Sequence, residues 1–405
     1  MPVRRAPMPR LCATGALLAI ATAAAHAADD HNLQFHGFAS QGYFLTRNNA
    51  LFTSESQDKG TFEFNEVALN AVATPVDRLR VGIQLFAQDF GDSFNNKPQI
   101  DWAYGDYSLP TYGVLDLGIT AGRLKMGHGL YNDYRDLDVT RTSVFIPMAV
   151  YNPRLRDYFL AVNGLGVHGT VNADAFGSFD FMTYLGGQSS DPHEGTIHDI
   201  FFDRGLDLDR VHIEAVDGAN VTWNTPLEGL RLKYSLFNLR GLDVAGTIQP
   251  GAIVPLIPGS AAQLNFNQLW DTIVSVEYQR GDLTLAAEAE YWYLKGLLHG
   301  DAGIPVTIPV YQIIHSAYLS AAWRLAPQWE VEGIWQWNEV DTVTAAKDKF
   351  YGFTAAVRFD PIEHWLIKAE YTWIHGTSLL RAAEQPHAGF DEVWGYFALK
   401  TTFDF

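Results

Sequence analysis

The sequence predicts an all-β fold: a transmembrane antiparallel β-barrel of about 16 strands, with short turns on one rim, long loops on the other and one loop folded into the lumen. Three observations predict it. Segments of about 10 residues alternate between apolar and polar side chains, as strands do that face lipid on one side and water on the other. Short turns alternate along the chain with long polar loops. After residue 27, no apolar stretch of about 18 residues is present to cross a membrane as a helix.

The first 27 residues have the three parts of a secretory signal peptide. Basic residues between Arg4 and Arg10 come first, an apolar stretch from Leu11 to Ala25 follows, and Ala25-His26-Ala27 has the small residues of a cleavage site. The apolar stretch is too short and too rich in alanine for a good membrane span. We therefore expect cleavage after Ala27 and a single barrel domain over residues 28–405.

The composition excludes several classes of protein. Cys12 is the one cysteine and lies in the expected signal peptide, so a mature chain offers no disulfide and no cysteine ligand. Loss of the three arginines of that peptide changes the net charge from −18 to −21, which excludes general electrostatic binding of nucleic acid. Nucleotide-binding glycine motifs and zinc-ligand spacings are absent from the sequence. We expect no cofactor and no metal.

Alternation assigns a face to the residues of each strand. From Leu79 to Gln88 the odd-numbered residues are apolar, and Arg80 and Gln84 fall on the other face. From Leu283 to Tyr291, leucine and alanine alternate with Glu288 and Glu290. The same pattern recurs from Trp329 to Trp337, with Glu330 and Glu332, and from Trp365 to Trp373, with Lys368 and Glu370. Carboxylates are costly in a soluble core, so we expect these polar faces to line a wet lumen.

The lengths of the turns and loops and the positions of the Trp and Tyr residues also fit a membrane barrel. Short turns are expected at residues 74–78, 280–282, 325–328 and 360–364, and long loops at Arg47–Gly60, Gln188–Asn220, Gly241–Asn267 and Lys295–Pro309. The least distinct strands are Phe62–Ala73 and Ala219–Asn224. Trp and Tyr gather at the ends of the apolar faces, as they do at membrane interfaces.

The last strand ends at the last residue, Phe405. Phe397, Leu399, Phe403 and Phe405 fall on one face, and Lys400, Thr402 and Asp404 fall on the other. We expect this strand to pair with the first strand and close the barrel, because an open sheet edge is not tolerated in lipid.

The signal peptide, the alternating strands and the C-terminal Phe together resemble Gram-negative outer-membrane porins. The resemblance implies the outer membrane as location, outer-membrane lipid as surroundings and a homotrimer as assembly. It also implies that the barrel-insertion machinery reads Phe405 as part of its signal. The stretch Ala121–Pro147 begins like the G-x-[FL]-K-x-P-x-G-L pattern of the phosphate-selective porin superfamily and of uncharacterised porin-like relatives. The matching residues are Gly122, Leu124, Lys125, Gly129 and Leu130, with Gly127 in the place of the proline.

The loop from Lys125 to Arg156 is the expected constriction. It connects the fifth strand, Leu115–Arg123, to the sixth, roughly Phe159–Val171, and in porins the loop at this position narrows the lumen. Small inward residues on both strands leave room for it, although they also suit barrel curvature alone. The side chains expected at the constriction are Arg80, Gln84, Asp101 and Arg123 on the wall and Lys125, Asp133, Arg135, Asp136, Asp138 and Arg141 on the loop. Their charges either set a transverse field across the passage or pair and anchor the loop; both interpretations stay open.

The function expected is that of a porin: passive diffusion of ions and small hydrophilic solutes. The excess of acidic over basic side chains favours a weak preference for cations. Loops such as Asp203–Arg210 would attract cations to the mouth of the pore. A plugged barrel serving as adhesin or structural protein is the alternative. A hydrolase is disfavoured, because no nucleophile is marked near His193 or His198, and we expect no catalytic residue.

Overall fold

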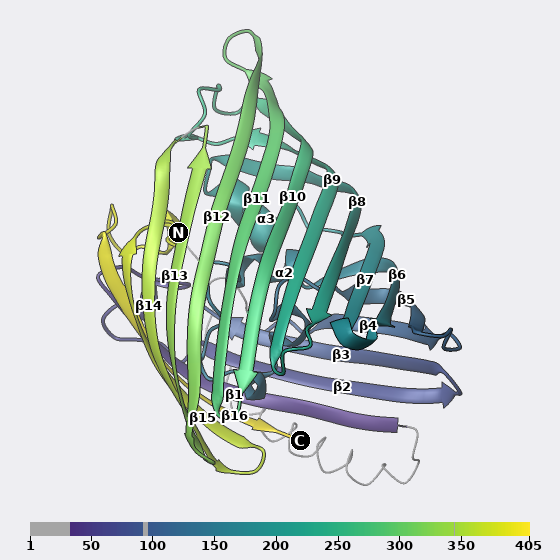
Figure 1. Ribbon diagram of the computed structural model, residues 1–405. Coiled ribbons are helices and arrows are strands. Elements are labelled where there is room, and N and C mark those ends of the chain that lie inside the picture. Colours follow the sequence, from purple (N-terminus) through teal and green to yellow (C-terminus); the bar gives the residue numbers. More distant parts are fainter. Residues whose placement is uncertain (1–32, 92–95, 344) are drawn as a thin grey trace.

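The described part of the chain, residues 33–91, 96–343 and 345–405 of a computed structural model, forms a closed antiparallel barrel of sixteen strands (Figure 1). The expected signal peptide lies outside the described residues. No helix among the described residues has the length and apolar character needed to cross a membrane. The strands are β1 (Leu33–Arg47), β2 (Phe64–Val76), β3 (Leu79–Phe90), β4 (Gln99–Ser108), β5 (Leu115–Lys125), β6 (Ala161–Asn172), β7 (Ser178–Gly187), β8 (Leu206–Asn224), β9 (Leu230–Ile248), β10 (Ala261–Arg280), β11 (Leu283–Asp301), β12 (Pro305–Ala326), β13 (Trp329–Thr342), β14 (Ala345–Ile362), β15 (Trp365–Gly376) and β16 (Val393–Asp404).

The barrel closes where the sequence predicts. β16 pairs with β15 on one side and with β1 on the other, and Phe38 lies opposite Asp404 in that register. The amide of Phe405 donates to the carbonyl of Gly37 at 3.0 Å, and the amide of Gly37 donates back to the carbonyl of Phe405 at 3.1 Å. Gly37 leaves space for this end of the chain, because a Cβ there would lie 2.7 Å from the Phe405 ring.

The predicted faces are also confirmed. Along β15, Leu366, Lys368 and Glu370 are buried, whereas Trp365, Tyr371 and Trp373 are exposed on the outward face. β11 and β13 show the same alternation, with glutamates inward. Exposed tryptophans such as Trp323, Trp329 and Trp365 lie beside the short turns, where an interfacial girdle is expected.

Two of the expected long loops, 241–267 and 295–309, are mostly strand, and the later part of a third, 188–220, is strand as well. β8 begins at Leu206, β9 runs to Ile248 and β11 runs to Asp301, so segments interpreted as loops extend the barrel wall instead. In Figure 1 the hairpin of β11 and β12 projects furthest at one end of the barrel. In these extensions the inward face is apolar: Leu208, Val244 and Leu264 are buried in one cluster with α3 (Gly195–Phe202). The outward face of these extensions is polar. A membrane strand has its apolar residues outward instead, so a search for strands with an apolar lipid-facing side does not find these extensions.

Candidate functional site

Residues 126–160, here called the inner segment, connect β5 to β6 and lie inside the barrel. Their short helices are η2 (Asn132–Tyr134), η3 (Asp138–Thr140), η4 (Pro153–Leu155) and α2 (Arg156–Phe159). Asn132 ties the two ends of the segment together, because its Nδ2 donates to the carbonyl of Met126 at 2.7 Å and to that of Phe159 at 2.5 Å. The contacts that hold the middle come from strands on the far side of the lumen.

Wall carboxylates accept hydrogen bonds from the backbone of the inner segment. Glu288 on β11 accepts from the amide of Leu130 at 2.7 Å. Glu332 on β13 accepts from the amide of Ser143 at 3.0 Å, and Glu370 on β15 accepts from the amide of Val144 at 2.6 Å. All three glutamates are buried, at 8% exposure or less. The inward glutamates predicted from the alternation therefore hold the segment rather than face open water. Amide donors are the partners that make such burial tolerable.

Asp138 gathers the largest group of charges in the site. Lys400 Nζ lies 2.7 Å from its Oδ2, Arg141 Nη2 lies 2.8 Å from its Oδ1, and Thr402 donates to it at 2.6 Å. Lys368, fully buried on β15, donates to the Asp138 carbonyl at 2.6 Å. Burial alone would raise the pKa of Asp138, but Lys400, Lys368 and Arg141 outweigh that effect and hold the pKa below its usual range.

A second charged group joins the segment to the opposite wall. Asp101 on β4 is fully buried, and its carboxylate meets Arg156 Nη2 at 2.8 Å and Gln84 Nε2 at 3.0 Å. Arg156 also pairs with Asp136 at 2.9 Å, and its guanidinium stacks over the ring of Phe86 at 4.2 Å from the centroid. Burial by itself would raise the pKa of Asp136, yet Arg156, with two more distant cations, holds that pKa below its usual range.

The remaining predicted residues are placed as follows. Lys125 Nζ donates to the carbonyl of Asp133 at 3.0 Å, and Asp133 itself pairs with Lys233 at 3.3 Å. Arg135 is buried, and burial lowers its pKa to about 10, so it remains charged at pH 7. Arg123 is half-buried on β5, next to the buried Leu124. Its Nε donates to the backbone carbonyl of Asp101 on the neighbouring strand β4 at 3.0 Å. Arg80 is exposed near the beginning of β3, opposite Asp106 in the strand register.

Between the inner segment and the β16–β1–β2–β3 wall lies a cavity of about 50 Å³, space for one or two waters. Its charged lining residues are Glu66, Arg135, Asp136, Arg141, Arg156 and Lys400, and its apolar ones include Phe64, Phe90 and Phe145. Four of these charges are positive and two are negative. The lining of this cavity is thus more basic than the chain as a whole.

Lys368, Lys400 and Arg156 hold the inner segment and are absent from the candidate set. The signal for the two lysines was present, because alternation places both on the inward face of their strands. A buried lysine on an inward face requires an acidic partner, and Asp138 supplies it from a distant part of the chain.

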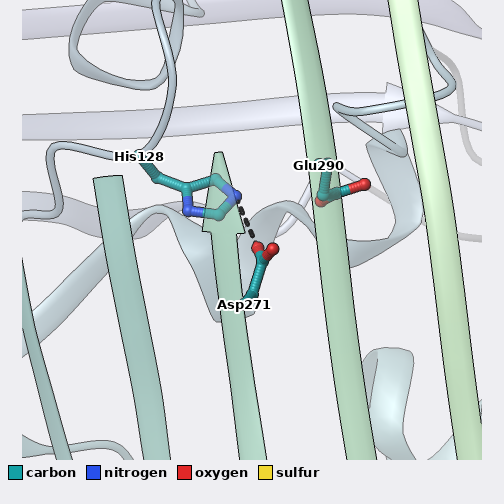
Figure 2. A group of neighbouring side chains, drawn as sticks. All are labelled: His128, Asp271 and Glu290. Atoms are coloured by element: carbon teal, nitrogen blue, oxygen red, sulfur yellow. Dashed lines mark ion pairs between the residues drawn. The ribbon is translucent and has the colours of Figure 1, made fainter. Parts of the chain in front are cut away.

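One group of side chains has the composition of a metal site. His128 on the inner segment, Asp271 on β10 and Glu290 on β11 are buried, and one ligand atom from each lies within 4.8 Å of the others. Figure 2 shows the imidazole reaching from its loop toward Asp271, with Glu290 on the next strand. These residues are too far apart in the sequence for spacing to reveal them.

No protein-family model and no curated protein matches the chain. Solved structures do. The anion-selective porin from Comamonas acidovorans is similar at a TM-score of 0.54 and 13% identity, over 92% of this chain and 99% of that one. The outer membrane channel DcaP of Acinetobacter baumannii is similar at 0.53 and 10% identity, over 92% and 97%. OmpF of Salmonella typhi is similar at 0.52 and 11% identity, over 93% and 99%. At these identities the likeness concerns the fold: this chain folds as the barrels of outer-membrane porins do.

Proposed function

We propose that the chain is a Gram-negative outer-membrane porin, through which ions and small hydrophilic solutes diffuse passively past the inner segment. The observation that carries the proposal is the charged cavity beside that segment. Glu288, Glu332 and Glu370 hold the segment to β11–β15. On the other side it contacts the wall only through a few charged groups, such as Asp138 with Lys400, and a cavity lined by charged side chains remains between them. A segment that served as a plug would gain nothing from a charged gap along one side. The proposal requires no catalytic residue and no cofactor.

The proposal is tested by the conductance of the refolded protein in a planar bilayer. Discrete steps are expected, and Arg135→Ala should raise their size, because Arg135 lines the cavity. Arg280→Ala, at the exposed end of β10 beside a short turn, is the matched control and should leave the steps unchanged. Folded protein that gives no steps in the bilayer would point to the plugged barrel, and equal effects of both substitutions would place the passage elsewhere.

Ion preference in this proposal has two opposing sources. The acidic balance of the chain attracts cations to the mouths, whereas the cavity lining carries four basic and two acidic side chains. Exposed charges are screened over about 8 Å at physiological salt, and enclosed charges are screened less. We therefore propose a weak cation preference at low salt that declines as the salt concentration rises. Reversal potentials at a fixed salt ratio over a series of absolute concentrations measure it, and a constant preference would contradict it.

The assembly is proposed to be a homotrimer in the outer membrane, without nucleic acid as a partner. One similar structure, OmpT of Vibrio cholerae, is described in a trimer form at 13% identity. Conductance that rises in groups of three equal steps on insertion would support a trimer. Isolated single steps would support a monomer.

A further inference from the structure

We propose that His128, Asp271 and Glu290 form a binding site for one divalent transition-metal cation of the Zn²⁺ type, which fastens the inner segment to the barrel wall. His128 belongs to the inner segment, and the two carboxylates belong to the neighbouring strands β10 and β11. The inference does not depend on whether the barrel conducts.

The geometry is close to that of a coordination sphere. His128 Nε2 lies 3.1 Å from Asp271 Oδ2 (Figure 2), and one ligand atom of each of the three residues lies within 4.8 Å of the others. Tetrahedral bonds of 2.0–2.1 Å to zinc separate two ligand atoms by roughly 3.4 Å. The widest pair therefore has to close by roughly 1.4 Å at most, which rotation of a glutamate side chain achieves.

The second observation is that Asp271 is poorly satisfied. It is fully buried, and neither of its carboxylate oxygens accepts a well-aligned hydrogen bond from the described residues; His128 Nε2, at 3.1 Å, is its partner in an ion pair. A buried carboxylate without hydrogen bonds or a countercharge is strongly unfavourable. Among the described residues, no lysine or arginine forms an ion pair with Asp271 or Glu290, so the only partner of this kind is His128.

The neighbouring Glu288 shows what a satisfied carboxylate looks like in this wall. It is also buried on β11, two residues from Glu290, and its oxygens accept from Ser275 at 2.6 Å, Leu130 at 2.7 Å and Tyr318 at 2.9 Å. The wall therefore supplies hydrogen-bond donors where a carboxylate is buried without a metal. Asp271 lies nearby and lacks them.

The donor set selects the kind of cation. One imidazole nitrogen and two carboxylate oxygens suit Zn²⁺ and similar transition metals better than Ca²⁺ or Mg²⁺, which prefer oxygen ligands alone. Three protein ligands leave a fourth position for water. Two carboxylates and a neutral imidazole also balance the double positive charge.

The site lies where a metal would act on the inner segment. The next two amides of the segment donate to the wall, Gly129 to Ser235 at 3.1 Å and Leu130 to Glu288 at 2.7 Å. A cation held by His128 would extend this attachment to the start of the segment and restrict its movement relative to β10 and β11. Bound metal should therefore raise the temperature at which the barrel unfolds.

The test is titration of the refolded, metal-free full chain with Zn²⁺ by calorimetry, with bound metal counted by elemental analysis. One tight equivalent per chain is expected. His128→Gln, Asp271→Asn and Glu290→Gln should each weaken it at least tenfold, and Zn²⁺ should raise the unfolding temperature of the wild type but not of the variants. His168→Gln is the matched control, because His168 pairs with Asp106 at 2.6 Å and belongs to no three-residue group.

The competing explanation is that Asp271 and Glu290 share a proton and bind no metal. In that case Asp271→Asn leaves the affinity for Zn²⁺ unchanged, and the wild type binds no more Zn²⁺ than the variants do. Equal binding by the wild type, the three variants and His168→Gln would likewise assign the metal to surface histidines and overturn the site. Because each variant is compared in its metal-free form first, a folding defect appears there and is separated from the loss of metal.

Discussion

Asp138 is the residue on which charged side chains of two strands converge. Lys368 and Lys400 are buried on β15 and β16, and both reach this one residue of the inner segment. Lys400 also pairs with Glu66, but among the described ion pairs Asp138 is the carboxylate partner of Lys368. A buried ammonium group without a carboxylate would be unstable, so Asp138 balances the wall as much as the wall holds Asp138.

Asp138→Asn should therefore destabilise the barrel by about 3–5 kcal/mol, the usual cost of removing one partner of a buried ion pair. It should also release the inner segment and add rapid current fluctuations. Unfolding in denaturant and single-channel recordings measure the two effects. Asp209→Asn is the control, because Asp209 is exposed on β8 and should change neither quantity. Equal stability of both variants would mean that the lysines find other partners.

The lowered pKa of Asp138 also predicts a pH dependence. A carboxylate whose folded pKa lies below its ordinary value of 3.8 stabilises the fold above that value, and the contribution is lost as the pH falls through the lower pKa. The contacts of Asp138 with Lys400 and Arg141 should thus stay intact from pH 7 down to about pH 4. Single-channel recordings along this range should show no new gating from this site. Gating that begins near pH 6 in the wild type and is absent from Asp138→Asn would contradict the assignment.

At the scale of the elements, β8 to β12 carry two kinds of surface along one strand. On β9, the outward Leu236 is exposed and alternates with the buried Phe237, whereas near the end of the strand the outward residues are polar and the inward Val244 and Ile248 are apolar. The first part has the pattern of a lipid-facing strand. The second has the pattern of a wall that encloses a core above the membrane.

This division predicts where a charge is tolerated. Leu236→Arg places a charge on the lipid face, at a cost of up to about 2–4 kcal/mol near the bilayer midplane. Thr247→Arg places the same charge farther along β9, roughly 36 Å at 3.3 Å per residue, beyond an apolar band of about 25 Å. Folding into lipid vesicles under denaturant should therefore be impaired for Leu236→Arg and nearly normal for Thr247→Arg. Equal penalties would show that lipid covers the whole strand.

The sequence predicts the lipid-facing parts of the strands well, and the extensions above the membrane and the contacts of the inner segment poorly. β11, β13, β15 and β16 were assigned with the correct inward residues, because lipid on one side enforces a strict period of two. The extensions of β8 and β9 were missed, because their core faces inward and that criterion no longer applies. Asp138 and Asp136 were recognised as charged residues of the loop. The pairing of Asp138 with Lys400 was not predicted, because a sequence does not record which wall a loop crosses to. The pairing of Asp136 with Arg156 was not predicted either, because the two residues are 20 positions apart in an irregular segment.

For the whole molecule, closure joins the two ends of the sheet. Among the described residues, β1 and β16 hydrogen-bond along ten paired positions, and the backbone of Phe405 adds two bonds with Gly37. The inner segment then bridges the interior between β4 and β16, through Asp101 and Lys400. Because early and late strands are connected both around the wall and across the lumen, the fold is complete when the last strand has paired.

A comparison of Phe405 with Phe403 distinguishes the proposed role of Phe405 as an assembly signal from its structural role in the last strand. Phe403 and Phe405 are outward-facing phenylalanines near the same end of the chain, exposed at 52% and 36%. Both rings lie mainly on the outward face, so Phe403→Ala and Phe405→Ala should fold with similar yield into detergent or vesicles, where no insertion machinery is present. In cells, Phe405→Ala should reduce the amount of barrel in the outer membrane severalfold more than Phe403→Ala. Gel-shift assays of heated and unheated membranes measure folded protein, and equal amounts of the two variants would remove the signal role from Phe405 and leave it as a closing residue.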